Sequence, residues 1–136
     1  KGDLVALDFS ATEPANGYGN HVLKCDTGDA LNMHAVGIAA ETIAAASTLA
    51  PISIQVYGLC TFAVCSNIAD SGGVALADAD EGQLLTASAE AGRLRDYDAG
   101  QAVGSGGDSL PVCILIEYGT ADTADSTVFL LNPANL

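Results

Sequence analysis

Apolar and polar side chains alternate with a period of two along much of this 136-residue chain. In residues 52–57, for example, Ile or Val occupies every even position, and Ser, Gln and Tyr occupy the odd ones. Successive side chains of a β-strand point to opposite faces, so this alternation is typical of strands with one buried face. A helical period of 3.6 residues is nearly absent. The pattern therefore predicts a mainly β fold.

Turn-forming residues divide the alternating pattern into short segments. We predict nine strands, in residues 3–9, 21–25, 33–39, 51–57, 59–65, 83–88, 93–97, 110–118 and 126–131. Gly58 interrupts the pattern and predicts a bent strand or a hairpin at that point. The Ala-rich residues 41–47 predict one or two helical turns. We therefore expect a small β-barrel or β-tulip-like fold with one or two short helical turns.

One domain is expected over residues 1–136, because this length and a hydrophobic content of 49% suit one core. Residues 1–20 contain the first predicted strand and a turn-rich loop, and residues 119–136 contain the last strand and a tail. Residues 1–9 are either a core strand or an arm that adds a strand to a neighbouring sheet. The apolar run at residues 127–131 has the same two interpretations. From these segments we predict contacts with a partner or a second subunit at Leu4, Leu7, Phe9, Tyr18, Phe129 and Leu131.

The chain is strongly acidic, because 17 Asp and Glu oppose four Lys and Arg and leave a net charge of -13. Four cations cannot neutralise the roughly six or more phosphates of a non-specific DNA complex, which excludes nucleic acid as a partner. Anionic membrane surfaces are disfavoured for the same reason. Polar residues interrupt every apolar stretch before the about 20 residues of a membrane helix, so we expect a soluble protein. The sequence opens at Lys1 without a basic and apolar leader, so we expect a signal peptide to be absent or already removed.

The four cysteines, Cys25, Cys60, Cys65 and Cys113, lack the spacing of a zinc site. Cys60 and Cys65 fall in one predicted strand, which separates their Cα atoms by roughly 16 Å. A disulfide needs about 4.4–6.8 Å. We therefore expect four reduced cysteines that serve as small core residues, in a reducing compartment.

Patterns that carry catalysis or bind a metal are nearly absent. His34 lies in an apolar strand, where a structural role is favoured over that of a general base. Residues 78–82 are similar to a calcium loop, but the glycine comes one position early and the closing Glu is missing, which favours an acidic turn. Residues 104–108 lack the lysine of a phosphate-binding loop. We predict no enzyme, no cofactor and no metal site, and no catalytic role for His21, His34, Asp78 or Asp80.

Val-Gly steps and glycine-rich motifs recur through residues 33–118, with Val36-Gly37 and Val103-Gly104 as the first and last. The motifs occupy residues 35–39, 52–58, 73–75, 82–86, 92–94 and 100–104, with an acidic, Ala-rich link after the first. This succession resembles the capsid cement, or head decoration, proteins of tailed bacteriophages. The resemblance implies a small β-barrel or β-tulip domain that binds the outside of the mature head and reinforces contacts between capsomers.

The resemblance also implies the major capsid protein as partner, a homotrimer, and a place on the capsid exterior after synthesis in the host cytoplasm. A protein that stabilises a shell needs a rigid fold and a surface that packaged DNA repels, and it needs no catalytic group. The alternative is a carbohydrate-binding or adhesive β module of a virion or cell surface, although Trp is absent and the four Tyr are dispersed. An enzyme is a third hypothesis, because His21, Asp26 and Asp29 could meet in space.

Overall fold

The computed structural model describes residues 1–7, 21–25, 35–42, 51–66, 76, 81–88, 90–97, 111–120 and 123–131. These ranges form nine β-strands, and they contain no helix. Within them, accordingly, no helix is long and apolar enough to cross a membrane. The predicted mainly β class is confirmed. The helical turns predicted at residues 41–47 lie, from residue 43 onward, outside the described residues.

Four strands form the first sheet, in the order β2-β1-β3-β4, and every neighbouring pair is antiparallel. The strands are β1 (Leu4–Leu7), β2 (Val22–Lys24), β3 (Ala35–Ala39) and β4 (Ile54–Gln55). Because β1 has a partner on each side, its backbone hydrogen bonds are taken up within the sheet. Its side chains are mostly buried, which makes it a core strand.

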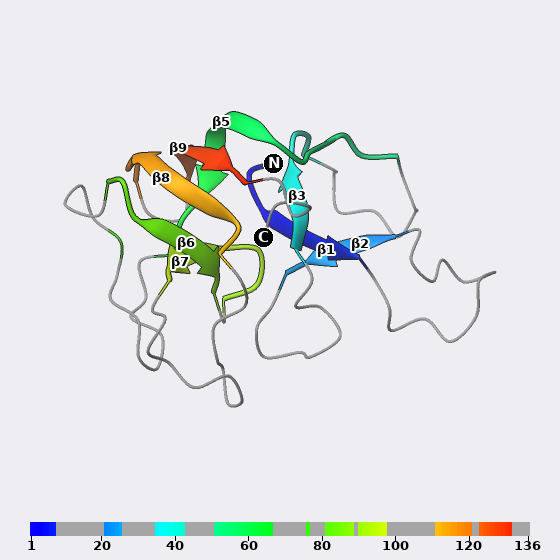
Figure 1. Ribbon diagram of the computed structural model, residues 1–136. Coiled ribbons are helices and arrows are strands. Elements are labelled where there is room, and N and C mark those ends of the chain that lie inside the picture. The colour runs from blue at the N-terminus through cyan, green and yellow to red at the C-terminus, as the bar shows by residue number, and fades with distance from the viewer. Residues whose placement is uncertain are drawn as a thin grey trace, which may run out of the picture.

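Five strands form the second sheet, in the order β5-β9-β8-β6-β7, again with antiparallel pairs. The strands are β5 (Gly58–Val64), β6 (Leu84–Ala87), β7 (Leu94–Asp96), β8 (Cys113–Glu117) and β9 (Ala124–Leu130). The sheet curls until its two edges meet at a parallel bridge between Cys65 and Leu94, where Ser66 N donates to Leu94 O at 2.9 Å. The two sheets lie beside each other as an open sandwich (Figure 1).

Gly58 is the point at which the chain passes from one sheet to the other. β4 belongs to the four-stranded sheet and β5 to the five-stranded sheet, and the two strands do not pair, so the chain bends here without a hairpin. Gly58 has φ +86°, and Gln55 Nε2 donates to Leu59 O at 2.6 Å across the bend. Nothing lies within 4 Å of the place that a Cβ would occupy, so the backbone conformation alone favours glycine.

One hydrophobic cluster draws side chains from both sheets. Leu4 and Ile38 enter it from the four-stranded sheet, and Leu85, Leu115 and Val128 enter it from the five-stranded sheet. The four cysteines are free and completely buried, which confirms their predicted role as reduced core residues. The shared core makes the two sheets one packing unit.

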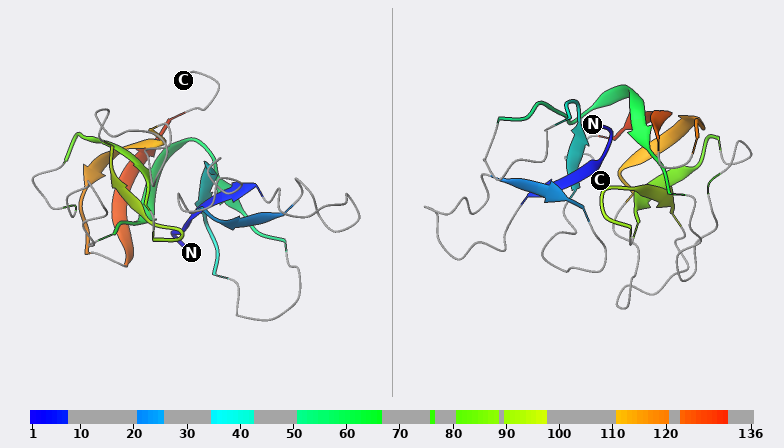
Figure 2. Two further views of the ribbon diagram at one scale, coloured as in Figure 1. Left: turned by 90° about the horizontal axis from the view of Figure 1, so that it is seen from below. Right: turned by 180° about the vertical axis from the view of Figure 1, so that it is seen from behind.

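The N-terminal residues connect the two sheets through the backbone. Gly2 N donates to Ala39 O at 2.8 Å, and Val64 N donates to Gly2 O at 3.1 Å. Figure 2 shows the N-terminus between the two groups of strands. Of the two interpretations of this segment, residues 1–7 follow the core strand, whereas residues 8–20 lie outside the described residues.

Candidate functional site

A row of large apolar side chains crosses the outer face of the five-stranded sheet. The register places Leu59 of β5 opposite Phe129 of β9. It also places Ile114 of β8 between Phe129 and Leu84 of β6. Residues directly opposite each other in a sheet point to the same face, so these four form one continuous apolar row. The strand positions next to them face inward and are completely buried: Cys60, Leu85, Cys113 and Val128.

Much of the apolar row is open to solvent. Leu59 is 57% exposed and Leu84 is 39% exposed. Ile116, two residues beyond the row along β8, is 47% exposed. Tyr57 extends the row, because its ring meets that of Phe129 edge to face with centroids 5.6 Å apart and is itself well exposed. A single exposed apolar residue is ordinary, whereas a contiguous group of them is typical of an interaction surface.

Two exposed carboxylates border this patch and form what we call the acidic margin. Glu117 ends β8, and Asp125 lies near the start of β9. Asp125 Oδ1 accepts hydrogen bonds from the Thr123 hydroxyl and, at 2.9 Å, from Thr120 N, and these bonds lower the pKa of the Asp125 carboxyl. Arg95 of β7 is buried, and its Nε donates to Ala87 O at 3.3 Å.

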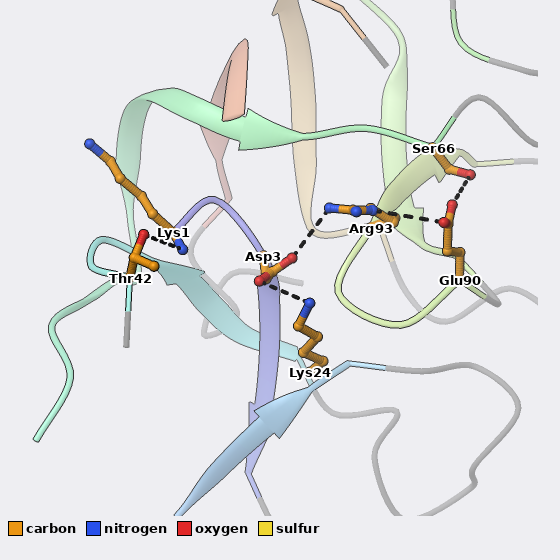
Figure 3. Close-up of polar contacts among 7 residues, drawn as sticks. All are labelled: Lys1, Asp3, Lys24, Thr42, Ser66, Glu90 and Arg93. Carbon is orange, nitrogen blue, oxygen red and sulfur yellow. Dashed lines mark hydrogen bonds and ion pairs between the residues drawn. The ribbon is translucent and has the colours of Figure 1, made fainter. Parts of the chain in front are cut away.

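A polar network joins the two sheets at a different place (Figure 3). Asp3 Oδ2 lies 3.2 Å from Lys24 Nζ, and Asp3 Oδ1 lies 3.4 Å from Arg93 Nη1. Arg93 Nε in turn lies 4.0 Å from Glu90 Oε1, and Ser66 Oγ donates to Glu90 Oε2 at 2.9 Å. Ser66 is buried, so a substrate in solvent cannot reach its hydroxyl. The geometry therefore fits a fastening between the sheets.

The thiols are poorly suited to nucleophilic chemistry. Burial raises the pKa of the Cys65 thiol to about 11, and burial likewise raises the pKa values of Cys60 and Cys113. The thiolate is the nucleophile and the metal ligand, and burial therefore disfavours the reactive form of these three groups. Among the described residues, no three His, Cys, Asp or Glu side chains lie where they could hold a metal ion.

The histidines and acidic residues considered for catalysis are only partly described. His21 is half-buried just before β2. The remaining members lie outside the described residues: Asp26, Asp29, His34, Asp78 and Asp80.

The contact residues predicted near the N-terminus do not form a surface in the described ranges. Leu4 is buried in the core, so in the folded domain its side chain cannot reach a partner. Leu7, at the end of β1, is half-buried. Phe9 and Tyr18 lie outside the described residues.

The two contact residues predicted near the C-terminus have different surroundings. Phe129 belongs to the apolar row and packs against Tyr57. Leu131 is half-buried and lines an apolar pocket at the junction of the sheets, together with Val36 and Val112.

Sequence reasoning missed the other members of the apolar row, and for Ile114 one signal could have indicated its place. Residues 113–116 read Cys-Ile-Leu-Ile, so they are apolar at both odd and even positions. A strand with a single buried face needs only one of these two sets. Cys113 and Leu115 already supply the buried face, so Ile114 and Ile116 indicate a second apolar face.

Comparison with known proteins adds no relative: no family model matches the chain, and no curated protein or solved structure matches it.

Proposed function

We propose that this chain is a non-catalytic structural module that binds a protein surface through the apolar row, together with Tyr57 and Ile116. The exposed row is the observation that carries the proposal. An antiparallel sheet with one solvated face usually presents polar side chains there, whereas these strands present Leu, Phe and Ile. Covering such side chains removes apolar surface from water and so stabilises the complex.

The partner we propose is the outer surface of a phage capsid, where the chain bridges neighbouring capsomers. The resemblance of residues 33–118 to capsid cement proteins supports this choice of partner. The net charge of -13 supports it as well, because such a surface is repelled by packaged DNA. A ligand that binds only the assembled shell stabilises that shell by mass action.

We also propose that the working unit on the capsid is a homotrimer, as the resemblance implies. Three copies at -13 each repel one another, but salt screens exposed charges beyond about 8 Å at physiological ionic strength.

The test is cosedimentation of the protein with expanded heads of its phage, followed by thermal melting of heads with and without saturating protein. Leu84→Ser and Leu23→Ser are a matched pair, because both leucines lie on strands and both are 39% exposed. Leu84 belongs to the apolar row, and Leu23 belongs to β2 of the other sheet. Urea unfolding of both variants first establishes that each is folded.

We expect Leu84→Ser, and more strongly Leu59→Ser, to weaken binding, while Leu23→Ser binds as the wild type does. Losing the burial of one such leucine costs about 1–2 kcal/mol, or roughly tenfold in Kd. Heads that melt at the same temperature with and without the protein would refute the stabilising role. Equal binding by Leu59→Ser, Leu84→Ser and Leu23→Ser would refute the choice of face.

A further inference from the structure

The outer face of the five-stranded sheet, which carries the apolar row, has two exposed carboxylates on one side. This distribution of charge restricts the kind of surface that can bind there. Its centre is the apolar row. Beyond this row, at the same end of the neighbouring strands β8 and β9, lie Glu117 and Asp125, which are both exposed. Arg95 of this sheet is buried, whereas Lys1 is exposed and its Nζ lies 4.8 Å from the ring centroid of Phe62 in β5. An approaching surface therefore meets apolar side chains in the middle and the two exposed carboxylates of Glu117 and Asp125 along one border.

A second copy of this chain fits this face poorly. A symmetric dimer would use the same patch on both copies. Each acidic margin would then face either the other margin or the other apolar row, between two chains that each carry -13. Both arrangements cost electrostatic or desolvation energy.

We propose that the partner is a patch of the capsid protein in which apolar side chains are bordered on one side by Lys or Arg. The basic border meets Glu117 and Asp125, and the apolar part covers the apolar row. This inference rests on the proposed function and adds to it the chemistry and the direction of docking. Charges at the border of an interface chiefly set the association rate, its salt dependence and the orientation of the partners.

The experiment measures the Kd for expanded heads at several salt concentrations. The variants are Glu117→Lys and a control, Glu41→Lys, which changes the net charge equally. Glu41 is exposed beyond β3 of the other sheet, where it accepts a hydrogen bond from Ser53. Glu117 is preferred over Asp125 for substitution because the Asp125 carboxylate holds its own loop. We expect Glu117→Lys to bind about three- to tenfold more weakly at low salt and to lose part of the salt dependence, with Glu41→Lys within about twofold of wild type.

The outcomes separate this inference from the proposed function. Equal weakening by Glu117→Lys and Glu41→Lys, or tighter binding by Glu117→Lys, would overturn the basic border while leaving binding through the apolar row intact. Wild-type protein that fails to bind heads would overturn both proposals. Sedimentation velocity of the free protein tests whether a second copy covers this face. Self-association that Leu59→Ser abolishes would assign the face to a second copy and overturn the inference.

Discussion

Gly92, at the turn before β7, carries the sharpest prediction for stability. It has φ +82°, its N–H donates to Cys25 O at 2.7 Å, and its carbonyl accepts from Leu4 N at 2.8 Å. A Cβ at this position would lie 3.0 Å from Asp3 Cβ and 3.1 Å from Lys24 Cδ. Gly92→Ala therefore disturbs both the left-handed turn and the contact between the two sheets.

Gly82→Ala is the matched control. Gly82 has φ +89° at the turn before β6, and nothing lies within 4 Å of the place its Cβ would take. Its substitution costs the left-handed conformation alone, about 1 kcal/mol after allowance for the more restricted unfolded chain. Gly92→Ala has the same cost and must also displace Asp3, which weakens the ion pairs with Lys24 and Arg93. We expect a total loss of about 2–3 kcal/mol for Gly92→Ala.

Urea unfolding, followed by circular dichroism, measures both losses from the midpoint at unchanged m value. The expected result is a free energy of unfolding about 1–2 kcal/mol lower for Gly92→Ala than for Gly82→Ala. Equal losses of free energy would show that the side chains of Asp3 and Lys24 move away from the new Cβ at no cost. The polar network would then not be a fastening between the sheets.

The remaining predictions concern the core, the N-terminus and two titrating groups. Leu115→Ala should cost about 2–4 kcal/mol in urea unfolding, while Ile116→Ala, one residue further on, should cost less than about 1 kcal/mol, because only Leu115 is buried. Deleting residues 1–10 should abolish the cooperative unfolding transition, since Gly2 within this segment bonds to Ala39 of one sheet and Val64 of the other; a folded, cooperative deletion variant would contradict that. Because the pKa of Cys65 is raised from 9.0 to about 11, its burial stabilises the fold fully below pH 9, and this stabilisation is lost between pH 9 and 11; Cys65→Ala should unfold with a shallower alkaline dependence. The Asp125 carboxyl has a lowered pKa, so its contribution is present above about pH 4 and is lost as the pH falls through the folded value; in acid titrations followed by urea unfolding, the stability difference between wild type and Asp125→Asn should shrink below about pH 4.

The positions of the strands could be predicted from the sequence because alternation is a local property. Residues 110–118 were predicted as a strand, and β8 occupies Cys113–Glu117 within them. The mainly β class follows from the same signal. Pairing is different, because β5 lies beside β9, which is far away in the chain (Val64 pairs with Ala124 and Gly58 with Leu130), and periodicity contains no information about partners. The bend at Gly58 shows the limit: glycine predicts a change of direction, and only the tertiary packing sends the chain into a second sheet.

The candidate site was predicted only in part for the same reason. Phe129 was identified from a local apolar run, and it does belong to the row. Leu59 and Leu84 can be assigned to the row only from the register, which places Leu59 of β5, Phe129 of β9, Ile114 of β8 and Leu84 of β6 in one line. Leu4 shows the opposite error, since an apolar residue near a terminus can belong to a partner or to the core, and here it is buried. Apolar character is visible in the sequence, whereas the face on which it lies depends on the fold.

The physical separation of core, fastening and candidate face makes the binding proposals testable on a folded protein. Inward positions such as Leu115 and Val128 hold the two sheets around one core, and Asp3 with Arg93 fastens them at their junction. Outward positions such as Leu59 belong to neither set, because Leu59 is absent from the core cluster and is 57% exposed. Replacing it with serine removes surface that water already reaches, so it should change stability by less than about 1 kcal/mol. A loss of binding in Leu59→Ser with unchanged unfolding would therefore report on the interface itself.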